Sequence, residues 1–186
     1  MTDLGSIFGG NFSYASEMNT SGQIVGGADL VDDVGGHAYL LDNGAVTDLS
    51  PYGSGISSWG SDINGNGDIV GSWGFTDTDP ADGPPLDALL CPCYAVVWHA
   101  GQPVFLNSVV DPQWNLMLGL RINDQGEIVA RGQFNGGPLQ TVLLKPLAGV
   151  PSKRSELAGA TRERGSSQTT PRAFRRERDG GIVAIH

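Results

Sequence analysis

The sequence of 186 residues has little positive charge, only two cysteines and no long hydrophobic run. Residues 1–150 contain sixteen acidic but three basic residues, a net charge of −13, and binding to nucleic-acid phosphates needs lysine and arginine. This part of the chain is therefore not expected to bind nucleic acid. No run of about 18 apolar residues occurs, so no membrane span is expected. Met1–Leu4 also lacks the basic and apolar regions of a signal peptide.

Charged residues of either sign are scarce, at 17% of the chain, whereas glycine and proline are frequent, with 28 and 11 residues. Helical bundles and coiled coils need Ala, Leu, Glu and Lys, and charge-rich disordered chains need many more charges. The composition excludes both classes. It favours an all-β domain with many turns.

Three ordered motifs recur along residues 1–146. The first carries Asn, then Gly three residues later, then an Ile-Val pair; the second is apolar on alternating positions; the third ends on Leu. They lie at 18–26, 63–71 and 122–130, at 37–41, 94–98 and 141–144, and at 1–4, 46–49 and 103–106. Their joint recurrence predicts internal repeats, with units of about 1–45, 46–102 and 103–146.

Each unit is predicted to form four short antiparallel strands. In the first unit these lie near 13–18, 23–28, 37–41 and 45–49, because the Asn-x-x-Gly segment and Asp42-Asn43-Gly44 are typical of hairpin turns. The strand at 37–41 is apolar on both faces, as expected of a sheet packed between two others. The fold class predicted is an all-β, propeller-like array of four-stranded repeats, and a β-solenoid is the alternative.

The sequence motifs of the repeats resemble the bacterial probable extracellular repeat called HAF. Met1–Gly5, Gly9-Gly10, the Asn-x-x-Gly-x-Ile-Val-Gly turn and His37–Leu41 carry the resemblance, which covers residues 1–146 and is strongest in the first unit. It implies a secreted or cell-surface repeat protein. The family brings no catalytic residues to this chain.

The predicted strands begin with the fourth strand of a unit, at residues 1–4. Two complete units of four strands follow, and the last unit has only its first three strands. The strand at 1–4 could therefore complete the last unit, as in ring closure of a propeller. Because rings usually have four to eight blades, about three blades predict a fragment, an open arc or half of a dimer. Residues 151–186 carry eight basic and four acidic residues with few apolar ones, and are predicted to be a basic, disordered tail.

One turn matches the start of a calcium loop. Oxygen-bearing side chains alternate in it, which makes calcium the one cation to consider, and the candidate metal ligands are Asp62, Asn64, Asn66 and Asp68. However, position twelve is Trp73 in place of the bidentate Glu, and Arg121 replaces the first Asp in the third unit. The hairpin turn alone explains the Asn and Gly residues. No other cofactor motif occurs.

A long insertion is predicted within the second unit, from about residue 76 to 92. It contains four aspartates and ends at Cys91 and Cys93, which flank Pro92. The favoured interpretation is an acidic surface loop with two free thiols. A disulfide, half of a metal site, or a cation- or ligand-binding loop are the alternatives.

No pattern of a catalytic site is found. The sequence lacks a nucleophile elbow, a phosphate-binding loop and a metalloprotease helix, and nothing selects two of its many acids for paired catalysis. His37 and His99 are expected to be ordinary half-exposed residues. The tryptophans could stack on sugars but are expected to pack inside the sheets: Trp59, Trp73, Trp98 and Trp114.

Two functions remain after these exclusions. The first is a non-enzymatic secreted or surface module that binds or displays an unknown ligand or protein partner. The second is a cation- or carbohydrate-binding propeller segment. An array of three blades also leaves an apolar sheet face open at each end, which predicts self-association of the 1–150 body, increasing with salt as the net charge is screened.

Overall fold

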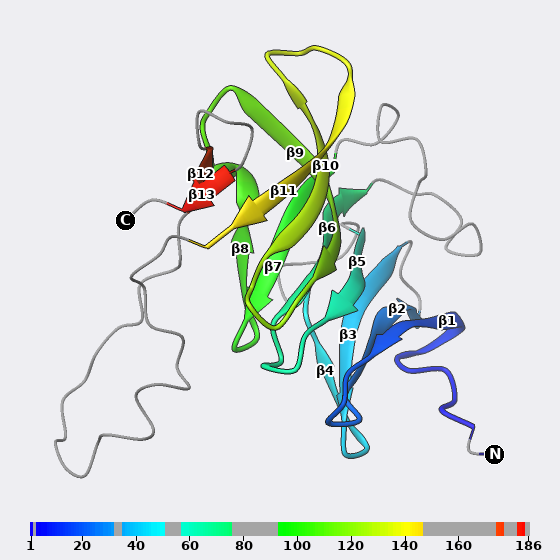
Figure 1. Cartoon of the computed structure of the whole chain (residues 1–186). Coiled ribbons are helices and arrows are strands. Elements are labelled where there is room, and N and C mark those ends of the chain that lie inside the picture. Colours follow the sequence, from blue (N-terminus) through cyan, green and yellow to red (C-terminus); the bar gives the residue numbers. More distant parts are fainter. Residues whose placement is uncertain are drawn as a thin grey trace, which may run out of the picture.

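The computed structural model describes residues 1, 3–31, 35–50, 57–75, 93–146, 174–176 and 182–184, the last two segments by their backbone. Strands dominate these residues, and their one helical segment is the 3₁₀ turn η3 (Leu106–Ser108). The predicted all-β class is confirmed. Figure 1 shows three sheets that follow one another across the molecule in chain order.

The first and second sheets each have four strands in the order of the chain, and all neighbours are antiparallel. The first contains β1 (Gly9–Met18), β2 (Ile24–Leu30), β3 (Gly36–Asp42) and β4 (Ala45–Asp48). The second contains β5 (Ser57–Ile63), β6 (Ile69–Phe75), β7 (Tyr94–His99) and β8 (Gln102–Phe105). The predicted four-stranded repeat is therefore confirmed in both units.

The third sheet differs at its last position. The strands β9 (Trp114–Ile122), β10 (Ile128–Phe134) and β11 (Leu139–Lys145) are antiparallel. Beside β11 lie β13 (Ile182–Ala184), which pairs with it in parallel, and then β12 (Phe174–Arg176). These two short strands belong to the segment predicted to be a tail. The rest of the predicted tail, residues 151–186, lies outside the described residues.

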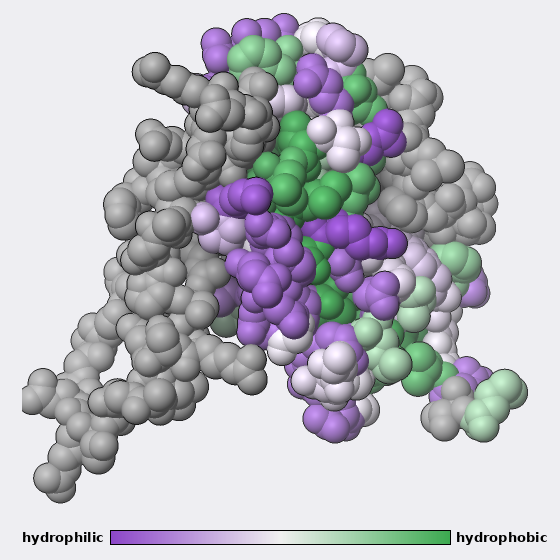
Figure 2. Space-filling model, viewed as in Figure 1, coloured by the Kyte–Doolittle hydropathy of each residue, from purple (hydrophilic) through white to green (hydrophobic). Residues whose placement is uncertain are grey.

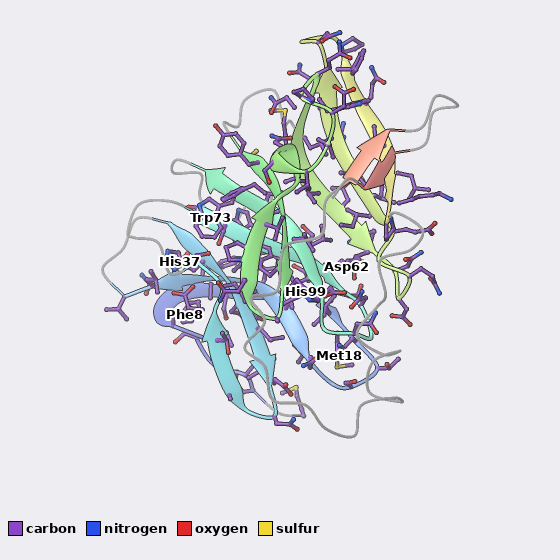
Figure 3. All side chains as sticks on the ribbon, turned by 90° about the vertical axis from the view of Figure 1, so that its left-hand side faces the viewer. Phe8, Met18, His37, Asp62, Trp73 and His99 are labelled. Carbon is purple, nitrogen blue, oxygen red and sulfur yellow. The ribbon has the colours of Figure 1, made fainter. Side chains whose placement is uncertain are left out.

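The strand expected at residues 1–4 is not found among the described ones, since Met1, Asp3 and Leu4 lie outside every strand. The proposal that this segment completes the third sheet is therefore wrong. The physical reason is the position of Phe8, whose ring meets the rings of His37 and Tyr39 edge-on, each at 6.5 Å between centroids. These contacts hold the N-terminal segment against the first sheet, and Figure 3 shows Phe8 beside His37.

Two apolar layers join the three sheets. The layer between the first and second contains Val25, Ala38, Leu49, Ile63, Ile69, Trp73, Val96 and Trp98. The layer between the second and third contains Val70, Ala95, Val97, Leu106, Val110, Trp114, Leu116, Ile122, Ile128, Ala130 and Leu144. The second sheet is thus covered on both faces, which explains why β7 is apolar on both alternating positions. The described sheets are not closed into a ring.

Candidate functional site

The Asn-x-x-Gly turns connect the first two strands of each sheet, and an asparagine side chain organises each one. The Oδ1 atom of Asn64 accepts hydrogen bonds from the backbone N–H groups of Asn66 and Asp68, at 3.0 and 2.9 Å. Asn19 and Asn123 accept the equivalent pairs from residues 21 and 23 and from residues 125 and 127. One amide oxygen therefore satisfies two turn N–H groups, which is the chemistry that favours Asn here.

The glycine at the fourth position completes the same turn. Gly22, Gly67 and Gly126 have φ angles of 80°, 82° and 77°, a region that side-chain-bearing residues rarely adopt. Each glycine N–H donates to the backbone carbonyl of its asparagine, at 3.0, 3.1 and 2.9 Å. The three turns are thus geometrically equivalent, although they lie 45 and 59 residues apart.

The amide nitrogens of two of these asparagines reach the next turn. Asn19 Nδ2 donates to the Asn64 carbonyl at 3.0 Å, and Asn64 Nδ2 donates to the Asn123 carbonyl, also at 3.0 Å. The contacts form an asparagine ladder, Asn19–Asn64–Asn123, that joins the three sheets at their turns. Asn19 and Asn64 are 8% and 3% exposed, so the ladder is buried over its first two members.

The candidate calcium ligands lie in the middle turn but their oxygens have other partners. Asp62 accepts the N–H of Ile63 through Oδ1 and that of Ile122 through Oδ2, at 2.9 and 2.8 Å. Asp68 faces Asn64 Nδ2 and His99 Nδ1. Asn66 turns its amide to the carbonyl of Asp124 at 2.9 Å. The structure therefore places these side chains in one turn and directs them to separate protein groups.

Titratable metal ligands do not gather elsewhere in the described ranges either. Across those residues, no group of three or more His, Cys, Asp or Glu side chains is placed to hold an ion. The predicted acidic insertion at about 76–92 lies outside the described residues. Cys93 is 2% exposed and is disulfide-bonded, which replaces the favoured interpretation of free thiols for this cysteine.

Both described histidines pair with a carboxylate of their own sheet. His37 is buried, and its Nδ1 lies 3.0 Å from Asp48 Oδ2. Burial raises the pKa of Asp48, but the hydrogen bonds from His37 and from the Ser50 N–H outweigh burial and leave that pKa below its usual value. His99 Nδ1 lies 2.5 Å from Asp68 Oδ1. The half-exposed surroundings predicted for both histidines fit His99 and are wrong for His37.

The tryptophans occupy the interior, as the sequence favoured. Trp59, Trp73, Trp98 and Trp114 are between 0% and 6% exposed. Trp59 packs under Tyr14, with ring centroids 5.2 Å apart, and burial raises the pKa of the Tyr14 hydroxyl to about 12. These rings therefore build the packing between sheets and offer little surface to a ligand.

Two aromatic residues that the sequence analysis did not single out do reach the surface. Tyr94 and Phe105 are 48% and 37% exposed, and their rings meet edge-on with centroids 6.2 Å apart. Buried Trp73 lies beneath Phe105 at 5.7 Å. The pairing of β7 with β8 brings these rings together, so a scan for tryptophan alone could not find them. We call Tyr94, Phe105 and Trp73 the aromatic patch.

The comparisons with known proteins do not assign this chain to a family. Among the described residues, no helix has the length and apolar character needed to cross a membrane. Searches against protein-family models, curated proteins and solved structures find no match to the chain.

Proposed function

We propose that this chain is a non-enzymatic binding or display module of a secreted or cell-surface repeat protein. The location rests on the resemblance of its repeats to HAF, and the unit of display is one four-stranded sheet. We further propose that the sheets follow one another as in part of a β-propeller. Supporting this arrangement are the face-to-face packing of successive sheets and the asparagine ladder that joins their turns.

The observation that carries the proposal is the use of polar groups within the described scaffold. His37 and His99 are each engaged with an aspartate of their own sheet, and the carboxylate of Asp62 accepts two backbone N–H groups. A catalytic acid or base must instead face a substrate proton at hydrogen-bond distance. These polar groups hold turns and sheets together and so have a structural role. A partner would contact the edges and loops of the sheets instead.

The aromatic patch supports a second candidate function, which is carbohydrate binding. An exposed pair of rings offers apolar faces to the C–H surface of a sugar, and the tyrosine hydroxyl adds a polar group at the edge. Tyr94 and Phe105 have this exposure, and Trp73 beneath Phe105 fixes the position of its ring. This candidate differs from the first because it requires saturable binding of a small ligand.

Calorimetry with calcium chloride and a glycan array on the full chain separates the two functions. The proposed binding or display role predicts no saturable heat with calcium and no glycan signal above background. Carbohydrate binding predicts a glycan signal that Tyr94→Ala abolishes. The matched control is Val31→Ala, which shortens an apolar side chain that is 58% exposed and lies outside the patch. Saturable binding of either ligand by the unmodified chain would overturn the first proposal.

A further inference from the structure

One row of residues recurs at the same place in all three sheets. It crosses neighbouring strands directly beside the asparagine turns, and we call it the leading row. Its members are Met18, Ile24, Leu41 and Val46 in the first sheet, Ile63, Ile69, Trp98 and Pro103 in the second, and Ile122, Ile128 and Leu144 in the third. Opposed residues of neighbouring strands share one face of a sheet, so each leading row lies on one face.

The leading row is buried at most positions in the second and third sheets. In the first sheet its two end residues are exposed, and Ile24 and Leu41 are only half-buried. Ile63, Ile69 and Trp98 are 4%, 1% and 0% exposed because the first sheet covers them. Met18 and Val46 at the ends of the first row are 60% and 41% exposed. Figure 3 shows Met18 at the turn end of the molecule. The first sheet thus presents a surface that is covered in each of its two successors.

The opposite face of each sheet carries a second row, which we call the trailing row. Val25 and Leu40 form it in the first sheet, Val70 and Val97 in the second, and Val129 and Leu143 in the third. Val25 and Val70 are fully buried against the following sheet, whereas Leu143 is 40% exposed. Figure 2 shows hydrophobic residues at the surface over the region of β9 to β11. The third sheet therefore presents the matching open face.

We propose that two copies of this chain associate head to tail, with the trailing row of one copy's third sheet packed on the leading row of the other copy's first sheet. The contact would repeat a packing that the chain already makes twice, between its first and second and its second and third sheets. Such a heterologous contact uses two different surfaces of the same chain. A second copy is the occupant because only a sheet with this trailing row reproduces that packing.

Charge favours the same pairing. Residues 1–50 contain seven acidic residues and no Lys or Arg. The three bases of residues 1–150 are Arg121, Arg131 and Lys145, and all three lie in the third sheet. The head-to-tail contact brings the third sheet, which holds these bases, toward the acidic first sheet, and complementary charges steer such an association.

The asparagine ladder also supports head-to-tail association. Asn64 both receives the amide of Asn19 on its carbonyl and gives its own amide to Asn123. Within the described residues, the Asn123 amide donates to Glu127 of its own turn, and the Asn19 carbonyl accepts from Gly22 of its own turn. One donor at the third turn and one acceptor at the first thus remain for the continuation of the ladder between copies.

Sedimentation velocity on the full chain, from about 5 to 200 µM, tests the association. The unmodified chain should sediment faster as its concentration rises. Val46→Asp blocks the leading row and Leu143→Asp blocks the trailing row, and each should weaken association at least about tenfold because a charge enters an apolar contact. Val31→Asp, directly after the end of β2 and away from the row, is the matched control and should associate like the unmodified chain. Circular dichroism and melting temperature establish that each variant is folded.

Mixing the two blocked variants distinguishes head-to-tail contact from symmetric pairing. Each variant alone should be monomeric, and the mixture should form a dimer, because one copy keeps an intact leading row and the other an intact trailing row. Association of either variant alone as tight as that of the unmodified chain would show that like faces pair and would overturn the proposal. A monomer of the unmodified chain over the whole concentration range would overturn it too. The outcome is independent of glycan or calcium binding.

Discussion

The middle and third turns have the same backbone geometry but different surroundings. Asn64 is 3% exposed and connects to both neighbouring turns, whereas Asn123 is exposed and receives a contact from one side. The same residue type therefore shapes a single hairpin at one position and joins three sheets at another. The comparison shows that how much a repeated turn stabilises the protein depends on whether a neighbouring sheet packs against it.

The largest expected effect is that of Asn64→Ala. The substitution leaves the N–H groups of Asn66 and Asp68 without their acceptor and removes the bond to the Asn123 carbonyl, in a buried turn. We expect the free energy of unfolding to fall by about 2–4 kcal/mol, measured by urea denaturation. Asn123→Ala, at the exposed end of the ladder, should cost about 1 kcal/mol or less.

Asn66→Ala is the matched control for this comparison. It removes the same type of side chain from the same turn and one bond between sheets, to the Asp124 carbonyl, but the residue is exposed. Its cost should stay below about 1 kcal/mol. Equal losses at Asn64 and Asn123 would show that the ladder adds nothing beyond the turn itself.

A smaller effect is expected at the position two residues before the asparagine. Asp62 is 7% exposed and accepts the Ile122 N–H of the third sheet, whereas its equivalent Arg121 is exposed. Asp62→Ala should lower the free energy of unfolding by about 1–2 kcal/mol, and Arg121→Ala by about 0.5 kcal/mol or less. Asp62→Asn, which retains one acceptor oxygen, should lie between the alanine variant and the unmodified protein.

The same measurement repeated with calcium decides what Asp62 does. A carboxylate that accepts two backbone N–H groups stabilises the protein equally with and without the ion. A calcium ligand would instead give the unmodified protein extra stability that Asp62→Ala loses, because ligands that bind the native state stabilise it. Such a gain would contradict the structural role assigned here.

The sequence predicts the local geometry of these turns but not their environment. Asp42-Asn43-Gly44 predicted a hairpin, and β3 ends at Asp42 while Asn43 and Gly44 adopt φ angles of 49° and 81°. These features depend on a few adjacent residues and their steric limits. The bond from Asn64 to Asn123 spans 59 residues, and no local pattern specifies it.

The sequence could not predict which segment pairs with the edge of the third sheet, for a related reason. The repeat pattern suggested that residues 1–4 would lie beside β11, but β13 occupies that edge in parallel orientation. Any extended segment can satisfy the backbone groups of an open edge. The choice is made by Phe8, which holds the N-terminal segment against His37 and Tyr39. Aromatic contacts between distant residues carry no periodic signal in the sequence.

The smallest expected effect concerns the acid at the fifth position of the third turn. Hydrogen bonds from Asn123 and from Lys145, whose Nζ lies 3.2 Å from Glu127 Oε1, hold the pKa of Glu127 below its usual value of 4.5. A lowered pKa means that the folded state favours the ionised carboxylate. Its contribution to stability is therefore complete above pH 4.5 and is lost as the pH falls through the folded-state pKa.

Carbon NMR titration of the Glu127 carboxyl measures this shift at the residue itself. Because the Asn123 bond is the largest cause, Asn123→Ala should raise the pKa toward 4.5 more than Lys145→Ala does. The global stability should change little in either variant, since Lys145 is exposed and Glu127 half-exposed, so water screens their charges. An unchanged pKa in Asn123→Ala would mean that the amide does not hold Glu127 in solution.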